Sequence, residues 1–207
     1  MHRSRLPLWL LTSLTLLLGA PCGAAAQERG PRLHVGAGMV LDFAGDVELD
    51  RGAIYNPGHD GLRATPGIRG HVDYQLLRHL TLGGMARMSW WEPSYTPRIG
   101  RSFLFDLGPR LLGKFDYRQF RFYGAISPGL TVSAVRDYGI GVNGAAAGFT
   151  LSITAAGLEW WFSRRAALFA ELGWVGHWFS HDSDQGPGNL NFRLSQGLLE
   201  LGFVFGM

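Results

Sequence analysis

Residues 156–178 read AGLEWWFSRRAALFAELGWVGHW, and this stretch decides the fold. On both sides of a short polar turn at 163–165, bulky apolar side chains alternate with a second set that includes Glu159, Glu171 and Gly173. Strict alternation is typical of β-strands, because successive side chains point to opposite faces. The stretch therefore predicts a hairpin with one apolar face and one face that carries carboxylates. This is the pattern of a membrane-spanning β-barrel, with lipid outside and carboxylates in the lumen.

The same alternation recurs along the chain in segments long enough to cross a membrane as tilted strands, which takes about 9 to 11 residues. The predicted strands are 33–44, 67–76, 80–91, 102–114, 120–133, 149–162, 167–179 and 191–205. Long connections alternate with short ones, as extracellular loops and periplasmic turns do. We therefore predict an all-β fold, an eight-stranded antiparallel up-and-down transmembrane β-barrel. Both ends of the barrel domain should lie on the side of the short turns.

Two local irregularities are expected in the wall. The apolar phase of 149–162 changes from odd to even numbers, which one extra residue near 155–157 would explain, so a β-bulge is predicted there. Pro128 has no N–H to donate and should interrupt the ladder locally.

The polar face distinguishes this barrel from a soluble, lipocalin-like one, which would turn its apolar face inward. The Leu, Phe, Met, Ile and Trp side chains of the apolar face are too bulky in sum for a narrow interior. The other face mixes small residues with both signs of charge, and we expect a structural salt-bridge network among them in the lumen. Its predicted members are Arg69, Asp73, Arg87, Asp106, Arg110, Arg121, Glu159, Glu171 and Glu200.

Aromatic residues should form two belts at the membrane interfaces. The belt at the long-loop ends is predicted to contain Trp90, Trp91, Trp174 and Trp178. The belt at the short-turn ends is predicted to contain Tyr74, Phe115, Tyr117, Phe120, Trp160, Trp161 and Phe162.

Residues 1–26 predict a cleaved signal peptide, which leaves 27–207 as the barrel domain. Arg3 and Arg5 precede an apolar run at 6–20, and three alanines at 24–26 form a cleavage site. The run is shorter than the roughly 18 residues of a spanning anchor. A lipoprotein with Cys22 as its first residue is the other alternative, although proline precedes that cysteine.

The C-terminal residues 200–207, ELGFVFGM, carry a family resemblance. They are similar to the assembly signal of the small outer-membrane β-barrel family that includes OmpA-like and OmpX-like proteins, although Met207 replaces the usual phenylalanine. The resemblance covers the whole mature chain. It implies insertion into the outer membrane of a Gram-negative cell envelope by the barrel assembly machinery. It also implies contact with outer-membrane lipid and lipopolysaccharide.

Catalytic signals are weak. His181, Ser183 and Asp184 are the only candidates for a His/Ser/acid set, which some barrels of this type use as lipid A deacylases. A solvated polar loop is the favoured explanation, because a loop with Gly186, Pro187 and Gly188 is a poor place to fix catalytic geometry. The spacing of His177 and His181 on a strand does not indicate a metal site. We expect no metal and no cofactor.

The remaining charge excludes nucleic acid as a partner. Without the two arginines of the signal peptide, 19 − 2 = 17 basic residues face 16 acidic ones, and no long basic run occurs. The sequence thus predicts a non-enzymatic barrel with a structural or surface-interaction role. Any extracellular ligand should bind through the long loops 45–64 and 136–148. A lipid-modifying enzyme and a small porin-like channel remain as alternatives.

Cleavage after Ala26 can be checked by the intact mass of the protein purified from membranes. The mass should correspond to a chain that begins at Gln27. A mass that retains residues 1–26 would support the anchor instead, and a lipid adduct on Cys22 would support the lipoprotein.

Overall fold

The computed structural model describes residues 32–50, 58–94, 101–135, 144–182 and 189–207. The predicted signal peptide lies outside these residues. Within them, no helix is long and apolar enough to cross a membrane. The strand elements are β1 Leu33–Asp50, β2 Gly58–Leu62, β3 Thr65–Leu77, β4 Leu80–Trp91, β5 Ser102–Tyr117, β6 Phe120–Val135, β7 Gly144–Trp161, β8 Ala166–Asp182 and β9 Asn189–Gly206.

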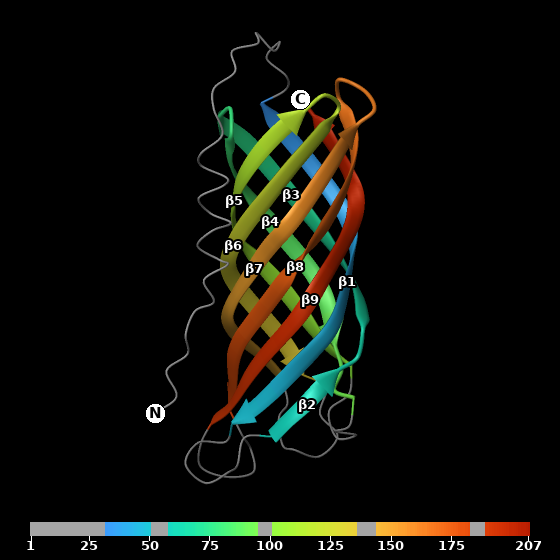
Figure 1. Cartoon of the computed structure of the whole chain (residues 1–207). Coiled ribbons are helices and arrows are strands. Elements are labelled where there is room, and N and C mark those ends of the chain that lie inside the picture. Colours follow the sequence, from blue (N-terminus) through green and yellow to red (C-terminus); the bar gives the residue numbers. More distant parts are fainter. Residues whose placement is uncertain (1–31, 51–57, 95–100, 136–143, 183–188) are drawn as a thin grey trace, which may run out of the picture. The chain divides into compact units, whose positions relative to one another are not determined.

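The strands form one closed antiparallel sheet. From β3 to β9 each strand pairs with the next in the chain, and β1 pairs with both β3 and β9 (Figure 1). Leu33 and Met207 exchange backbone hydrogen bonds, so the first and last strands meet at the end that carries the short turns. The predicted eight-stranded up-and-down barrel is therefore confirmed.

The short element β2 occupies no ninth position in the wall. Pairs between β1 and β3 run from Leu33↔Tyr74 to Asp42↔Thr65, and pairs between β1 and β2 continue in the same register from Gly45↔Leu62. Thus β2 extends the line of β3 after a break at residues 63–64. The prediction of a loop over 45–64 was wrong for the described part of that segment. Cross-strand hydrogen bonding to β1 holds Gly58 and Asp60–Gly61 in a strand despite their preference for turns.

Other strands also extend beyond the predicted ends. β7 begins at Gly144, inside the predicted loop 136–148, and β8 and β9 are paired as far as Asp182↔Asn189. The connection between the predicted strands 102–114 and 120–133 contracts to Arg118 and Gln119. The reason is the same in each case: a backbone group next to an existing strand finds its hydrogen-bond partner by continuing the ladder.

Both predicted irregularities are confirmed. The register of β7 shifts between Thr154 and Ala156 against β8, and it shifts at the same place against β6. The pairing of β5 with β6 stops after Leu107↔Leu130 and resumes at Leu111 in the same register, which leaves Pro128 within the gap. A further bulge in β1 lies between Phe43 and Asp46, where Ala44 has a positive φ of 46°.

The predicted faces of the strands are confirmed by exposure. Outward side chains such as Met39, Leu130 and Leu201 are 69%, 71% and 58% exposed, whereas their neighbours on the lumen face are buried. Trp91 does not belong to the predicted belt, because it is fully buried in the lumen. Trp161 is likewise on the inner side, packed against Ala167, Phe169 and Val204. Both residues lie on the inward phase of their strands, and this phase outweighs the preference of tryptophan for the interface.

The outward apolar face predicts the cost of a charge at mid-membrane. Leu172→Arg, in the middle of the outer face of β8, should destabilise the barrel folded in lipid vesicles by about 2–4 kcal/mol, measured by denaturant unfolding. Phe205→Arg, next to the end of β9, is the control and should cost about 0–1 kcal/mol. Equal costs at both positions would contradict the assignment of this face to lipid.

Candidate functional site

The lumen is the most chemically specialised part of the barrel, and Glu171 of β8 is its centre. The carboxylate accepts hydrogen bonds from the guanidinium groups of Arg69 on β3 and Arg110 on β5. It also accepts hydrogen bonds from the hydroxyls of Tyr123 at 2.7 Å and Thr154 at 2.8 Å. Five strands thus converge on one buried carboxylate through alternating inward positions.

Two further carboxylates complete this central group. Arg110 contacts Asp73 at 2.5 Å, and Arg69 contacts Glu200 at 2.5 Å. The side chains of all five charged residues, Glu171 included, are at most 5% exposed. Each arginine therefore bridges two carboxylates, which suits a planar guanidinium with several fixed donors.

A second group lies around Arg87 of β4. Its guanidinium donates to Asp42 of β1 and to the hydroxyl of Ser89 at 3.2 Å, and it lies 4.0 Å from Asp106. Asp106 also contacts Nε2 of His177 at 3.0 Å. All of these side chains are buried.

A third group lies toward the short turns and is less buried. Arg121 of β6 contacts Asp116 at 2.8 Å and Glu159 at 3.0 Å. The indole N–H of Trp161 donates to Glu159 at 2.8 Å, and the Arg121 guanidinium lies 5.1 Å from the centre of the Trp161 ring. Asp116 is 27% exposed, so water reaches this end of the lumen.

The nine residues predicted for the lumen all face inward and all form ion pairs, in three groups of contacts. Sequence reasoning missed the ionisable partners Asp42, His71, Asp116 and His177, and the hydrogen-bond donors Ser89, Tyr123, Thr154 and Trp161. Strict alternation along the predicted strands 33–44 and 120–133 puts Asp42 and Tyr123 on the inward phase, so this signal could have located them. Which of these side chains meet across the lumen depends on the stagger of strands that are far apart in the sequence, and no local pattern shows it.

Arginine alone does not balance the charge of the two buried groups. Three arginines (Arg69, Arg87 and Arg110) face five carboxylates (Asp42, Asp73, Asp106, Glu171 and Glu200). Two histidines lie against these carboxylates: His177 is 3.0 Å from Asp106, and His71 is 3.8 Å from Asp73. Both side chains are buried and belong to the lumen. Within the described residues, no cluster of His, Cys, Asp and Glu has the make-up of a metal site.

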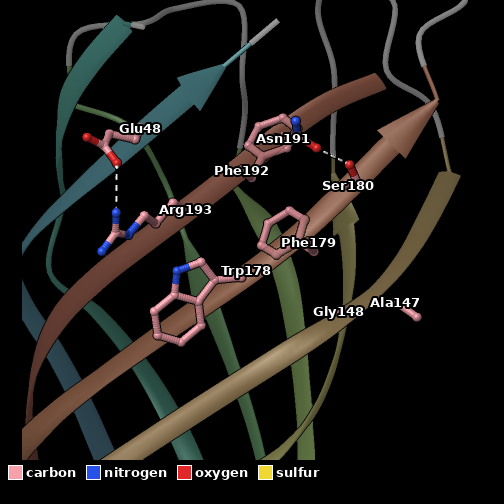
Figure 2. A pocket seen from close by; sticks show the side chains of 9 residues that line it. All are labelled: Glu48, Ala147, Gly148, Trp178, Phe179, Ser180, Asn191, Phe192 and Arg193. Carbon is pink, nitrogen blue, oxygen red and sulfur yellow. Dashed lines mark hydrogen bonds and ion pairs between the residues drawn. The ribbon is translucent and has the colours of Figure 1, made fainter. Parts of the chain in front are cut away.

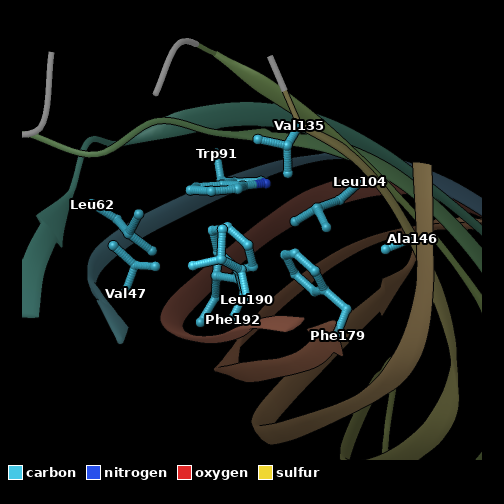
Figure 3. Packing of buried hydrophobic residues seen from close by; sticks show 10 residues of the cluster. Val47, Leu62, Trp91, Leu104, Val135, Ala146, Phe179, Leu190 and Phe192 are labelled. Carbon is cyan, nitrogen blue, oxygen red and sulfur yellow. The ribbon is translucent and has the colours of Figure 1, made fainter. Parts of the chain in front are cut away.

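An apolar plug, defined here as Val47, Leu62, Trp91, Leu104, Val135, Ala146, Phe179, Leu190, Phe192 and Leu194, fills the lumen at the long-loop end (Figure 3). The rings of Phe179 and Phe192 are stacked, with centroids 5.2 Å apart and planes at 13°. Trp91 packs edge-on against Phe192 at 5.8 Å. The charged groups are thus separated from the outer mouth by close-packed apolar side chains.

Of the predicted catalytic candidates, only His181 lies in the described part of the chain. His181 lies on β8 instead of in a loop, and its buried ring packs edge-on against Phe179 at 5.8 Å and Phe192 at 5.6 Å. The extension of β8 places it on the inward phase, beside the plug. Ser183 and Asp184 lie outside the described residues.

The outer wall carries a pocket of about 650 Å³ at the long-loop end. It is lined by Glu48, Ala147, Gly148, Trp178, Phe179, Ser180, Asn191, Phe192 and Arg193 (Figure 2). Arg193 lies 3.6 Å from Glu48, and the Ser180 hydroxyl donates to the side-chain oxygen of Asn191.

No family model and no curated protein sequence matches this chain. Solved structures do match. The outer membrane protein OprG from Pseudomonas aeruginosa superposes with a TM-score of 0.63 at 9% identity, over 86% of this chain and 97% of OprG. Neisserial surface protein A gives 0.55 at 14%, over 87% and 100%. The outer membrane protein AlkL, solved in lipid bilayers, gives 0.54 at 10%, over 91% and 95%.

This chain has the fold of the small outer-membrane β-barrels. The agreement covers 95–100% of each of these three proteins and 86–91% of this chain. At such low identity the likeness concerns the fold alone.

The contacts of Glu171 predict its effect on stability. Glu171→Ala leaves Arg69 and Arg110 buried with one carboxylate each, and loss of one partner of a buried ion pair typically costs about 3–5 kcal/mol. Unfolding in urea from lipid vesicles should show a loss of this size, and the heat-resistant folded band on a gel should convert at a lower temperature.

Asp116→Ala is the matched control for this experiment. It removes a carboxylate that also contacts an arginine but is partly exposed, and it should cost about 0–1 kcal/mol. An unchanged transition for Glu171→Ala would show that the central group does not support the barrel.

Proposed function

We propose that the protein is an integral protein of the cell outer membrane with a non-enzymatic, structural or surface-interaction role. The observation that carries this proposal is the filled lumen. Buried ion pairs occupy its middle, and the apolar plug occupies its outer end. An eight-stranded barrel has room for little more than its own side chains, so the interior serves to hold the wall.

The position of the strands supports a role at the cell surface. The β1–β2 hairpin and the extended ends of β7, β8 and β9 lie at the end opposite the short turns (Figure 1). These strand ends extend the barrel wall past the apolar outer face, in the direction away from the short turns. We propose that an extracellular ligand would be bound at this end, through segments 45–64 and 136–148. These contain the described strand parts 45–50, 58–62 and 144–148.

The last strand supports assembly by the barrel assembly machinery. β9 carries outward Leu199, Leu201, Phe203 and Phe205 at alternate positions, and it closes the barrel on β1. The assembly machinery has to close the barrel by pairing the last strand with the first. The last strand is therefore where we expect the machinery to bind.

Two measurements on the same protein test this proposal. Membrane fractionation should find the heat-modifiable chain in the outer membrane, and the folded protein in a planar bilayer should give no stable conductance. Ohmic channel steps that disappear on denaturation would overturn the filled-lumen argument and favour the small channel.

The enzyme alternative has its own test. Purified protein incubated with acylated lipid A should release no fatty acid. Release that is lost in Ser183→Ala would replace the present proposal with the lipid-modifying one.

A further inference from the structure

One row of the outer wall combines rings and charges in a way that the lumen does not explain. Phe149 of β7 pairs with Trp178 of β8, Trp178 pairs with Arg193 of β9, and Arg193 pairs with Glu48 of β1. The Phe149 and Trp178 rings are 5.8 Å apart. The inward positions of β8 and β9 at this level are Phe179 and Phe192, so the row itself faces outward.

The row lies where the outer face of β9 changes from apolar to polar. On β9, the outward residues toward the short turns are Leu199, Leu201 and Phe203, which are all exposed. The outward residues of β9 toward the long loops are Ser195, Arg193 and Asn191. On β8 the indole N–H of Trp174 donates to the Ser195 hydroxyl at 2.7 Å. Tryptophan with a polar partner is typical of the membrane interface. Arg193 is therefore placed one step beyond the hydrocarbon, at the depth of lipid headgroups.

At this level the wall is also hollowed. The pocket of about 650 Å³ has Trp178 on its membrane side, Arg193 beside it, and Ser180 and Asn191 in the next outward positions (Figure 2). It therefore offers a cation, an indole and a pair of hydrogen-bonding side chains within one depression that opens to the side of the barrel.

We propose that this pocket binds the phosphorylated sugar headgroup of an outer-leaflet glycolipid. Its phosphate is bound by Arg193, its sugar ring lies against Trp178, and its hydroxyls reach Ser180 and Asn191. The acyl chains run down the apolar wall past Trp174 and Leu199. This inference rests on the proposed outer-membrane location, which supplies the lipid. A free phosphate would make no contact with the apolar wall on the membrane side of Arg193. A lipid would contact both Arg193 and this apolar wall.

The contact between Arg193 and Glu48 leaves the arginine available. The two side chains are 63% and 38% exposed and 3.6 Å apart, and ion pairs of this kind contribute little. A phosphate accepts two parallel hydrogen bonds from a guanidinium and forms the stronger pair. Glu48 therefore competes weakly for Arg193, and its removal should favour the lipid.

The test is lipid binding by folded, detergent-solubilised protein, followed by native mass spectrometry. Diphosphoryl lipid A should bind more tightly than its dephosphorylated form and more tightly than phosphatidylglycerol. Arg193→Gln should weaken binding of diphosphoryl lipid A about tenfold. Trp178→Leu should weaken it several-fold, and Glu48→Gln should strengthen it.

Arg63→Gln is the matched control. Arg63 lies beside β2 at the same end of the barrel, is 60% exposed and, like Arg193, contacts a glutamate, Glu92 at 2.9 Å, but it does not line the pocket. It should leave the affinity unchanged. Equal losses of affinity in Arg63→Gln and Arg193→Gln would show that general surface charge causes the effect, and would overturn the proposed site.

Two other results would also overturn the proposal. Phosphatidylglycerol that binds as well as diphosphoryl lipid A would exclude recognition of the sugar. Full affinity in both Arg193→Gln and Trp178→Leu would exclude this pocket. Because the purified protein is supplied with lipid directly, these outcomes do not depend on membrane fractionation, which tests the location separately.

Discussion

Closure of the backbone hydrogen-bond ladder between β1 and β9 is the constraint on which the rest of this structure depends. In hydrocarbon each unpaired N–H or C=O group is costly, so a sheet that crosses a membrane has to leave no edge. Leu33 and Met207 meet at one end of this seam, and the pairing continues to Asp50 and Asn191 at the other. The seam joins the most distant parts of the described chain.

Closure creates a narrow interior that the side chains themselves have to fill. Toward the outer end they do so with rings and aliphatic groups, and in the middle with arginines and carboxylates. Buried ion pairs add little stability compared with an apolar filling, but each becomes costly once a partner is missing. The central group around Glu171 ties six strands together, and so it favours the one stagger of the strands in which every charge has a partner.

The outer surface of the barrel has two zones. A broad apolar face ends at the tryptophans of β8. Beyond it, toward the long-loop end, the strands continue into a polar rim with Arg193, Glu48 and the β1–β2 hairpin. Lumen and rim therefore differ in chemistry: ion pairs and apolar side chains fill the interior, whereas the rim carries exposed charged and polar side chains.

The sequence by itself determined the architecture of this protein. Period-two alternation in eight segments was enough to predict the strand count, the faces and the bulge near Ala155, because side-chain direction in a strand depends only on position along it. The same rule placed all nine predicted charges in the lumen. Local signals failed where neighbouring strands decide: Gly58 and Asp60–Gly61 joined a strand, and His181 lies on β8 instead of in a loop. For Trp91 the alternation was right and the belt assignment was wrong, because its strand phase already points it inward.

Only the tertiary structure decided which groups meet. Arg87 pairs with Asp42 from β1, Asp106 is joined by His177 from β8, and the row Phe149, Trp178, Arg193 and Glu48 comes from four strands. These contacts depend on the relative stagger of strands around a closed barrel. The stagger is set by the sum of all cross-strand hydrogen bonds and by the packing of the lumen, and no single segment of the chain contains it.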